Sequence, residues 1–155
     1  MPSPQRLRKS SGSVSKSLGS MSSWQTKRSP YETPGILMKN SSGGALVDGD
    51  VVIVDNAEDR AVKTTTTAGM PNPLVVLTGA DAGENVRCYP LSGVAVITCD
   101  GPAISPGDKI ITSSTEKYGK KLEAEAASSL LGIAVSGKAG AGDAEIDVLL
   151  LCSPV

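Results

Sequence analysis

The side chains that could do chemistry in this 155-residue sequence are serine, lysine, aspartate, glutamate and three cysteines. Histidine is absent, which removes the commonest general base and metal ligand and, with them, every Ser-His-Asp and Cys-His site. Cys88, Cys99 and Cys152 include no C-x-x-C pair, and their number is odd. We therefore expect buried, reduced thiols in place of a zinc site or a disulfide framework.

Two glycine-rich segments and a group of aspartates have the residue types of ligand sites. Residues 132–137 and 137–142 superficially match phosphate-binding loops, but neither ends in Gly-Lys-Ser/Thr before a long helix, so we interpret them as hairpin turns. Asp48, Asp50 and Asp55 lack the twelve-residue loop and closing glutamate of a calcium site, which favours solvated turn acids. We expect no enzymatic activity, no cofactor and no bound metal.

The basic residues are distributed unevenly along the chain. Residues 1–30 hold six cations and no acid: Arg6, Arg8, Lys9, Lys16, Lys27 and Arg28. The remainder holds the other 9 of the 15 basic residues and all 16 acidic ones, a net charge of 9 − 16 = −7. A basic segment attached to an acidic body can bind nucleic acid, an acidic protein surface or the body of a neighbouring copy, and composition alone does not choose among them.

An extended N-terminal arm is expected over residues 1–43. Residues 1–23 are rich in serine and poor in branched or aromatic side chains, so in isolation they bury too little apolar surface to offset the entropy of ordering. Trp24 and Tyr31 follow in polar surroundings, where two prolines favour an extended chain. These aromatic side chains are either packed anchors of a linker or the grip of an arm on a partner.

Neither a membrane nor a secretory pathway is indicated. No apolar run reaches the roughly 18 residues that a membrane helix needs. The basic start is followed by serine, glycine and lysine over residues 10–23, where a secretory signal would have an apolar stretch. We therefore expect no membrane partner.

Residues 44–155 have the pattern of an all-β body. Short aliphatic and β-branched runs alternate with turn residues at a spacing of roughly 8 to 12 residues, which predicts a small β-barrel or a sandwich. Residues 74–77 predict a strand buried on both faces. Residues 84–89 and 93–99 are predicted to pair as a hairpin, and residues 123–131 allow one helical turn at most. The other predicted strands cover residues 45–47, 51–54, 61–67, 109–112, 121–123, 130–136 and 144–151.

Six short motifs follow one another in the C-terminal half of the chain. They are DAGENVR (81–87), LSGV (91–94), SPGDKI (105–110), KKL (120–122), LGIAV (131–135) and GDAEIDVLL (142–150). Each motif alone is a generic turn and strand. Their order and spacing resemble the small capsid decoration, or cement, proteins of tailed bacteriophages, and residues 44–67 carry the likeness more weakly.

This resemblance implies a β-tulip body that forms a homotrimer on the outer surface of the expanded phage head. Members of this family clamp neighbouring major capsid subunits against the pressure of packaged DNA, often with an extended N-terminal arm. The implied partners are the major capsid protein and other copies of the chain, in the virion, and no catalytic residue is implied. The candidate capsid-binding residues of the arm are Arg6, Arg8, Lys9, Lys16, Trp24, Lys27, Arg28 and Tyr31.

Two other functions stay open at the level of the sequence. The six cations of the arm are the footprint of a nucleic-acid or polyanion binder, although the acidic body would repel a phosphate backbone. A Ser-Lys or carboxylate-pair enzyme on a β-barrel is the other alternative, because serine, lysine and acids are plentiful.

Overall fold

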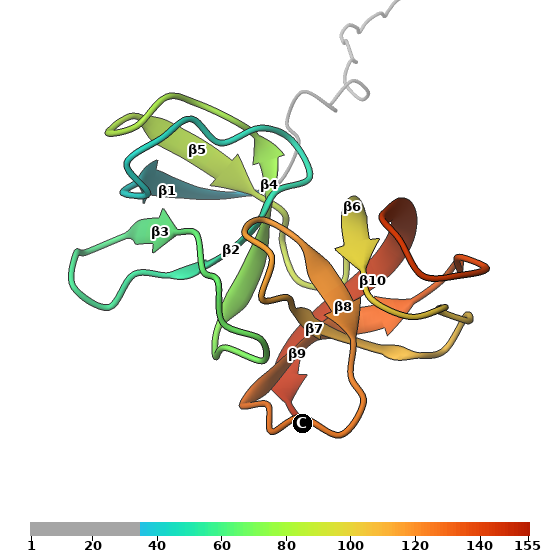
Figure 1. The fold of residues 1–155 in the computed structure, drawn as a ribbon. Coiled ribbons are helices and arrows are strands. Elements are labelled where there is room, and N and C mark those ends of the chain that lie inside the picture. The colour runs from blue at the N-terminus through green and yellow to red at the C-terminus, as the bar shows by residue number, and fades with distance from the viewer. Residues whose placement is uncertain (1–34) are drawn as a thin grey trace, which may run out of the picture. The chain divides into compact units, whose positions relative to one another are not determined.

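Strands are the only regular elements of the computed structural model within the residues that it describes, 35–155 (Figure 1). That part of the chain has no helix that could cross a membrane. The all-β prediction is confirmed. The strands are β1 (Ile36–Asn40), β2 (Val51–Val54), β3 (Ala61–Lys63), β4 (Pro73–Thr78), β5 (Asn85–Cys88), β6 (Val94–Asp100), β7 (Lys109–Thr112), β8 (Gly119–Lys121), β9 (Ser129–Ala134) and β10 (Ala144–Pro154).

The strands close into two five-stranded barrels, each built from one half of the described chain. The order around the first barrel is β1-β3-β2-β4-β5, and the order around the second is β6-β8-β7-β9-β10 (blue to green and yellow to red in Figure 1). In both, the first and third strands are parallel and every other neighbouring pair is antiparallel. The two barrels therefore have one topology, and closure removes the exposed sheet edges that invite aggregation.

Each barrel has an aliphatic core, because successive side chains of a strand point to opposite faces. In β6, Ala95, Ile97 and Cys99 are buried, whereas Val94 and Val96 are exposed. Burial of each large aliphatic side chain contributes about 1.5–3 kcal/mol. The first core contains Met38, Leu46, Val52, Val62, Leu74, Val76, Val86 and Cys88. The second contains Ala95, Ile97, Cys99, Ile104, Ile110, Leu131, Ala134, Ile146, Val148 and Leu150, together with two valines of the first barrel.

The two barrels are repeats of one unit, related by a constant shift along the sequence. Gly49 and Gly107, which are 107 − 49 = 58 residues apart, both have positive φ, at 90° and 96°, in a turn that leads into the second strand of each barrel. The carboxylates of the next residues, Asp50 and Asp108, each accept the backbone N–H three residues earlier, at 2.9 and 2.8 Å. The same turn, with the same side-chain hydrogen bond, therefore starts both β2 and β7.

Long-range contacts follow the same shift. Leu46 and Ala80 form an isolated antiparallel bridge in the first barrel, and Ile104 and Lys138 form its counterpart in the second. Each bridge member is 58 residues from its equivalent, as 104 − 46 and 138 − 80 show. A shift that holds for both local turns and distant pairs indicates duplication of the unit.

The first barrel packs against the second through the outer face of β2 and β4. Val51 and Val75 are paired across these strands and are buried among the core residues of the second barrel. The N–H of Val51 donates to the carbonyl of Lys117 at 3.0 Å, and the N–H of Met70 donates to Thr112 Oγ1 at 2.9 Å. The second barrel thus covers the outer side of β4, which explains why residues 74–77 have an apolar run.

β1 lies inside the stretch, 1–43, that the sequence assigned to the arm. Met38 and Asn40 are both buried in the first barrel, because β1 closes it between β3 and β5. The Asn40 side-chain amide donates to the carbonyls of Gly44 and Ala80, at 2.8 and 3.1 Å, which offsets the burial of a polar group. The compact unit accordingly begins at Gly35.

The predicted hairpin of residues 84–89 and 93–99 was wrong. β5 pairs with β1 and β4, whereas β6 pairs with β8 and β10, so the chain between them connects two barrels. Barrel closure holds this connection in place, since Ser92 donates to the carbonyl of Leu150 at 2.8 Å and Leu150 donates to that of Gly93 at 2.9 Å. Residues 123–128 contain bends and no helical turn.

The repeated aspartate gives an acid-sensitivity prediction. The Ser105 N–H, followed by the Lys121 ammonium, holds the pKa of Asp108 below its ordinary value of 3.8. Because the folded-state pKa is depressed, the stabilisation is present above pH 3.8 and is lost as the pH falls through the lowered value. We expect Asp108→Asn to unfold at a lower temperature than the wild type at pH 7, and the difference to shrink below pH 3 in thermal melts followed by circular dichroism.

Asp143→Asn, at an exposed position of the β9–β10 loop, is the matched control and should follow the wild-type curve. A difference between Asp108→Asn and the wild type that is equally large at both pH values would contradict this role of the carboxylate charge.

Candidate interaction surfaces

The candidate arm residues all lie outside the part of the chain that the structure describes. Arg6, Arg8, Lys9, Lys16, Trp24, Lys27, Arg28 and Tyr31 precede Gly35, where the description begins. Their proposed contact with a capsid stays a prediction. The surfaces below belong to residues 35–155.

The thiols of the described region are poor nucleophiles. All three cysteines are free; Cys88 and Cys99 are buried, as predicted, and Cys152 is half-buried. Burial raises the pKa of Cys88 to about 11 and that of Cys99 to about 12. Both thiols are therefore protonated at neutral pH, and the thiolate is the reactive form. Among residues 35–155 no group of three or more His, Cys, Asp or Glu side chains could hold a metal ion.

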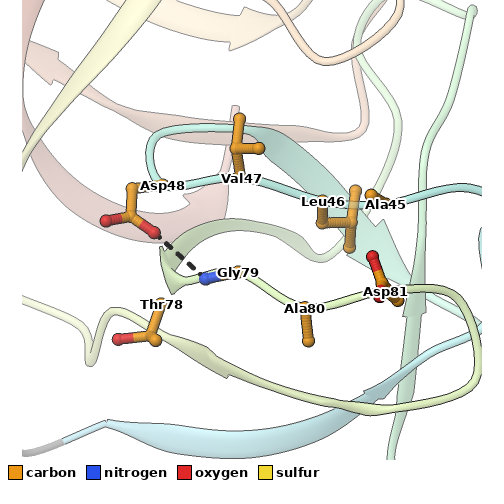
Figure 2. Close-up of a pocket in the computed structure, with 8 residues that line it drawn as sticks. All are labelled: Ala45, Leu46, Val47, Asp48, Thr78, Gly79, Ala80 and Asp81. Carbon is orange, nitrogen blue, oxygen red and sulfur yellow. Dashed lines mark hydrogen bonds between the residues drawn. The ribbon is translucent and has the colours of Figure 1, made fainter.

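A shallow hollow of about 510 Å³ lies where residues 45–48 run beside residues 78–81 in the first barrel (Figure 2). The carboxylate of Asp48 accepts the N–H of Gly79 at 3.0 Å, shown as the dashed line in Figure 2, and Asp81 contributes a second carboxylate. The remaining lining is mainly aliphatic. Such a surface attracts cations but lacks the base-activated nucleophile that covalent catalysis requires.

The second barrel fills the equivalent position with its own cation. Lys138, the counterpart of Ala80, is 9% exposed, and its ammonium donates to the carbonyls of Gly101, Gly140 and Gly142 at 2.6, 2.9 and 2.9 Å. The two aspartates of the hollow correspond to a proline and an alanine there. Lys138 thus ties two loops of the second barrel together, and its role is structural.

The outer face of the second barrel carries an aliphatic surface. Val94 of β6 pairs with Leu149 of β10, and Leu149 pairs with Ile133 of β9, so the three side chains form one row. Val94 is 54% exposed and Val96, two residues along, is 49% exposed. Exposed aliphatic side chains that adjoin one another typically mark an interaction surface.

Comparison with known proteins identifies the fold. No family model matches the chain, and no curated protein matches it. A solved structure does match: the head fiber gp8.5 N base of bacteriophage phi29, with a TM-score of 0.53, 15% sequence identity, and coverage of 79% of this chain and 97% of that one. The chain has the fold of a phage head fiber base. At this identity the likeness is one of fold.

The sequence analysis missed both the repeat and the aliphatic face. The repeat had a signal, because the Gly-Asp dipeptides at 49–50 and 107–108 each precede a run of aliphatic residues and are 58 residues apart. The aliphatic face had none, since alternation along β6 places apolar residues on both sides of the strand and does not say which side is covered.

Proposed function

We propose that this protein is a structural component of a phage virion, a decoration protein that binds the outside of the expanded head as a homotrimer. In this role it clamps neighbouring major capsid subunits against the internal pressure of DNA. The observation that carries the proposal is the fold shared with a phage head fiber base over 79% of the chain. The ordered motifs of the C-terminal half independently resemble decoration proteins.

The physical properties of residues 35–155 support a binding role. Closed barrels provide a rigid body, and the aliphatic row of Val94, Leu149 and Ile133 provides a surface for partners. The thiols are buried or half-buried, and the hollow at Asp48 and Asp81 has no nucleophile beside a base. We accordingly propose no enzymatic activity.

The arm supplies the test of the clamping role. Purified protein is added to expanded heads that lack it, and occupancy and the temperature of head disruption are measured. We expect binding to raise that temperature. Deletion of residues 1–30 should weaken attachment at least tenfold and leave the circular dichroism of the β body unchanged, because the basic segment lies outside both barrels in sequence.

A chain in which the six cations of residues 1–30 are replaced by glutamine is the matched control for length. It separates attachment through charge from attachment through Trp24 and Tyr31. Failure of the full chain to bind expanded heads would refute the decoration role. Unchanged affinity after the deletion would refute the clamp while leaving the body as a capsid binder.

Polyanion binding through the same segment is the second candidate, favoured by six cations without an acid in residues 1–30. A salt titration against duplex DNA distinguishes the two, because displacement of counterions makes phosphate binding fall steeply as salt rises. DNA binding that disappears with the deletion, together with no binding to heads, would favour this candidate.

A further inference from the structure

The junction between the two barrels defines a docking face on the repeated unit. Val51, Val75 and Tyr89 lie side by side on the outside of the first barrel: the valines are paired across β2 and β4, and Tyr89 donates its N–H to the carbonyl of Val75 at 2.9 Å. All three pack against core residues of the second barrel. The first copy of the unit thus uses this face to bind the second copy.

The second copy has the same face, and it is open. Lys109 pairs with Ile133, as Val51 pairs with Val75 in the first copy. Ile133 in turn pairs with Leu149, which occupies the place of Tyr89. Lys109 is exposed, Ile133 and Leu149 are half-buried, and the adjoining Val94 is 54% exposed.

The first copy, for its part, has an open receiving end. Within the chain, the receiving end of the second barrel includes Thr112, which is fully buried, and Lys117, whose carbonyl accepts the Val51 N–H. Their equivalents 58 residues earlier are Val54, which is 36% exposed, and Asp59, which is exposed. Residues 35–155 therefore leave one docking face and one receiving end unoccupied.

The charges of the two open surfaces are complementary. The contact between Val51 and Lys117 within the chain becomes, after the 58-residue shift, a contact between Lys109 and Asp59. Around Lys109, Lys121 forms an ion pair with Asp108 at 3.1 Å, so the docking face has a cationic surplus. Opposite charges at the rim of an interface select the correct partner and its register.

We propose that the open face of the second barrel, centred on Lys109, Ile133 and Leu149, docks onto Val54 and Asp59 of the first barrel of a second copy of this chain. The contact repeats between chains the junction that joins the barrels within one chain. It is heterologous, so successive copies close into a ring when the rotation allows. The inference goes beyond the proposed function, since it assigns the surfaces through which copies meet whether or not a capsid is present.

Charge reversal in the full-length chain tests this contact. Sedimentation velocity over a range of protein concentrations gives the association constant without capsids, so its result is independent of capsid binding. We expect the wild type to self-associate, Lys109→Glu and Asp59→Lys each to weaken association at least tenfold, and the double variant to recover to within about threefold of the wild type. Asp143→Lys, in an exposed loop of the second barrel, is the control and should associate as the wild type does.

Both reversed side chains are exposed, so the variants should keep the circular dichroism spectrum of the wild type. A wild type that stays monomeric at every concentration overturns the proposal. So do folded single variants that associate as tightly as the wild type, and a folded double variant that is as weak as either single one.

Discussion

Val75→Asp is expected to lower the free energy of unfolding by about 4 kcal/mol, because it places a carboxylate between the two barrels without a partner. Val75 is fully buried among the core residues of the second barrel. Its equivalent in the second barrel, Ile133, lies on the open face, so Ile133→Asp should cost only about 1 kcal/mol, which reflects the poor strand propensity of aspartate. Urea denaturation at a concentration where the chain is monomeric measures both values.

The pair of variants also separates stability from association. Ile133→Asp should abolish self-association while the monomer stays folded, whereas Val75→Asp should disturb the monomer itself. Equal losses of stability in the two variants would show that the faces of the two barrels are not used differently.

Gly79→Ala is expected to destabilise the protein by about 3 kcal/mol through overpacking. A Cβ atom at Gly79 would lie 2.1 Å from the carbonyl oxygen of Leu46, which is backbone and has little freedom to move. Gly137 is the equivalent residue of the second barrel, and a Cβ there would lie 2.3 Å from the carbonyl oxygen of Ile104. Gly137→Ala should therefore show a loss of the same size, measured by chemical denaturation.

Gly44→Ala is the matched control, since a Cβ at that position meets no atom within 4 Å. Its stability should be unchanged or higher by up to about 1 kcal/mol, because alanine restricts the unfolded chain. If Gly79→Ala were as stable as Gly44→Ala, the close approach of the two segments at the Leu46–Ala80 bridge would be refuted.

The fold class and many strand positions could be predicted from the sequence. The period-two pattern of β6 and the buried run 74–77 are local signals, and both correspond to observed strands. The absence of phenylalanine predicted aliphatic cores, as found in both barrels. Such patterns depend only on neighbours along the chain, which is why they survive without knowledge of the tertiary structure.

Strand partners could not be predicted in the same way. The short link between β5 and β6 is typical of a hairpin, yet each strand finds its partners within its own barrel, since closure there satisfies both of its edges. β1 was assigned to the arm because its only large apolar residues are Ile36, Leu37 and Met38, and the buried Asn40 looks polar in sequence. Its burial depends on a side-chain amide that bonds to a loop 40 residues away.

The candidate arm shows the other limit of sequence reasoning. Charge and composition identified residues 1–30 as a binding segment, and these residues lie outside the described part of the chain. The open face around Lys109 and Ile133 became visible only when the repeat showed that the matching face of the first barrel is occupied. Comparison of the two copies within one chain supplied what a single strand pattern does not contain.

The separation of strand pairing into two halves has a consequence for synthesis of the chain. Every strand of the first barrel lies before residue 89 and every strand of the second lies after residue 93, so no ladder joins the halves. On the ribosome, the first barrel can complete its backbone hydrogen bonds before the second has emerged. During that interval Val51 and Val75 face water, and they are the point at which a nascent chain would need a chaperone or would meet another nascent chain.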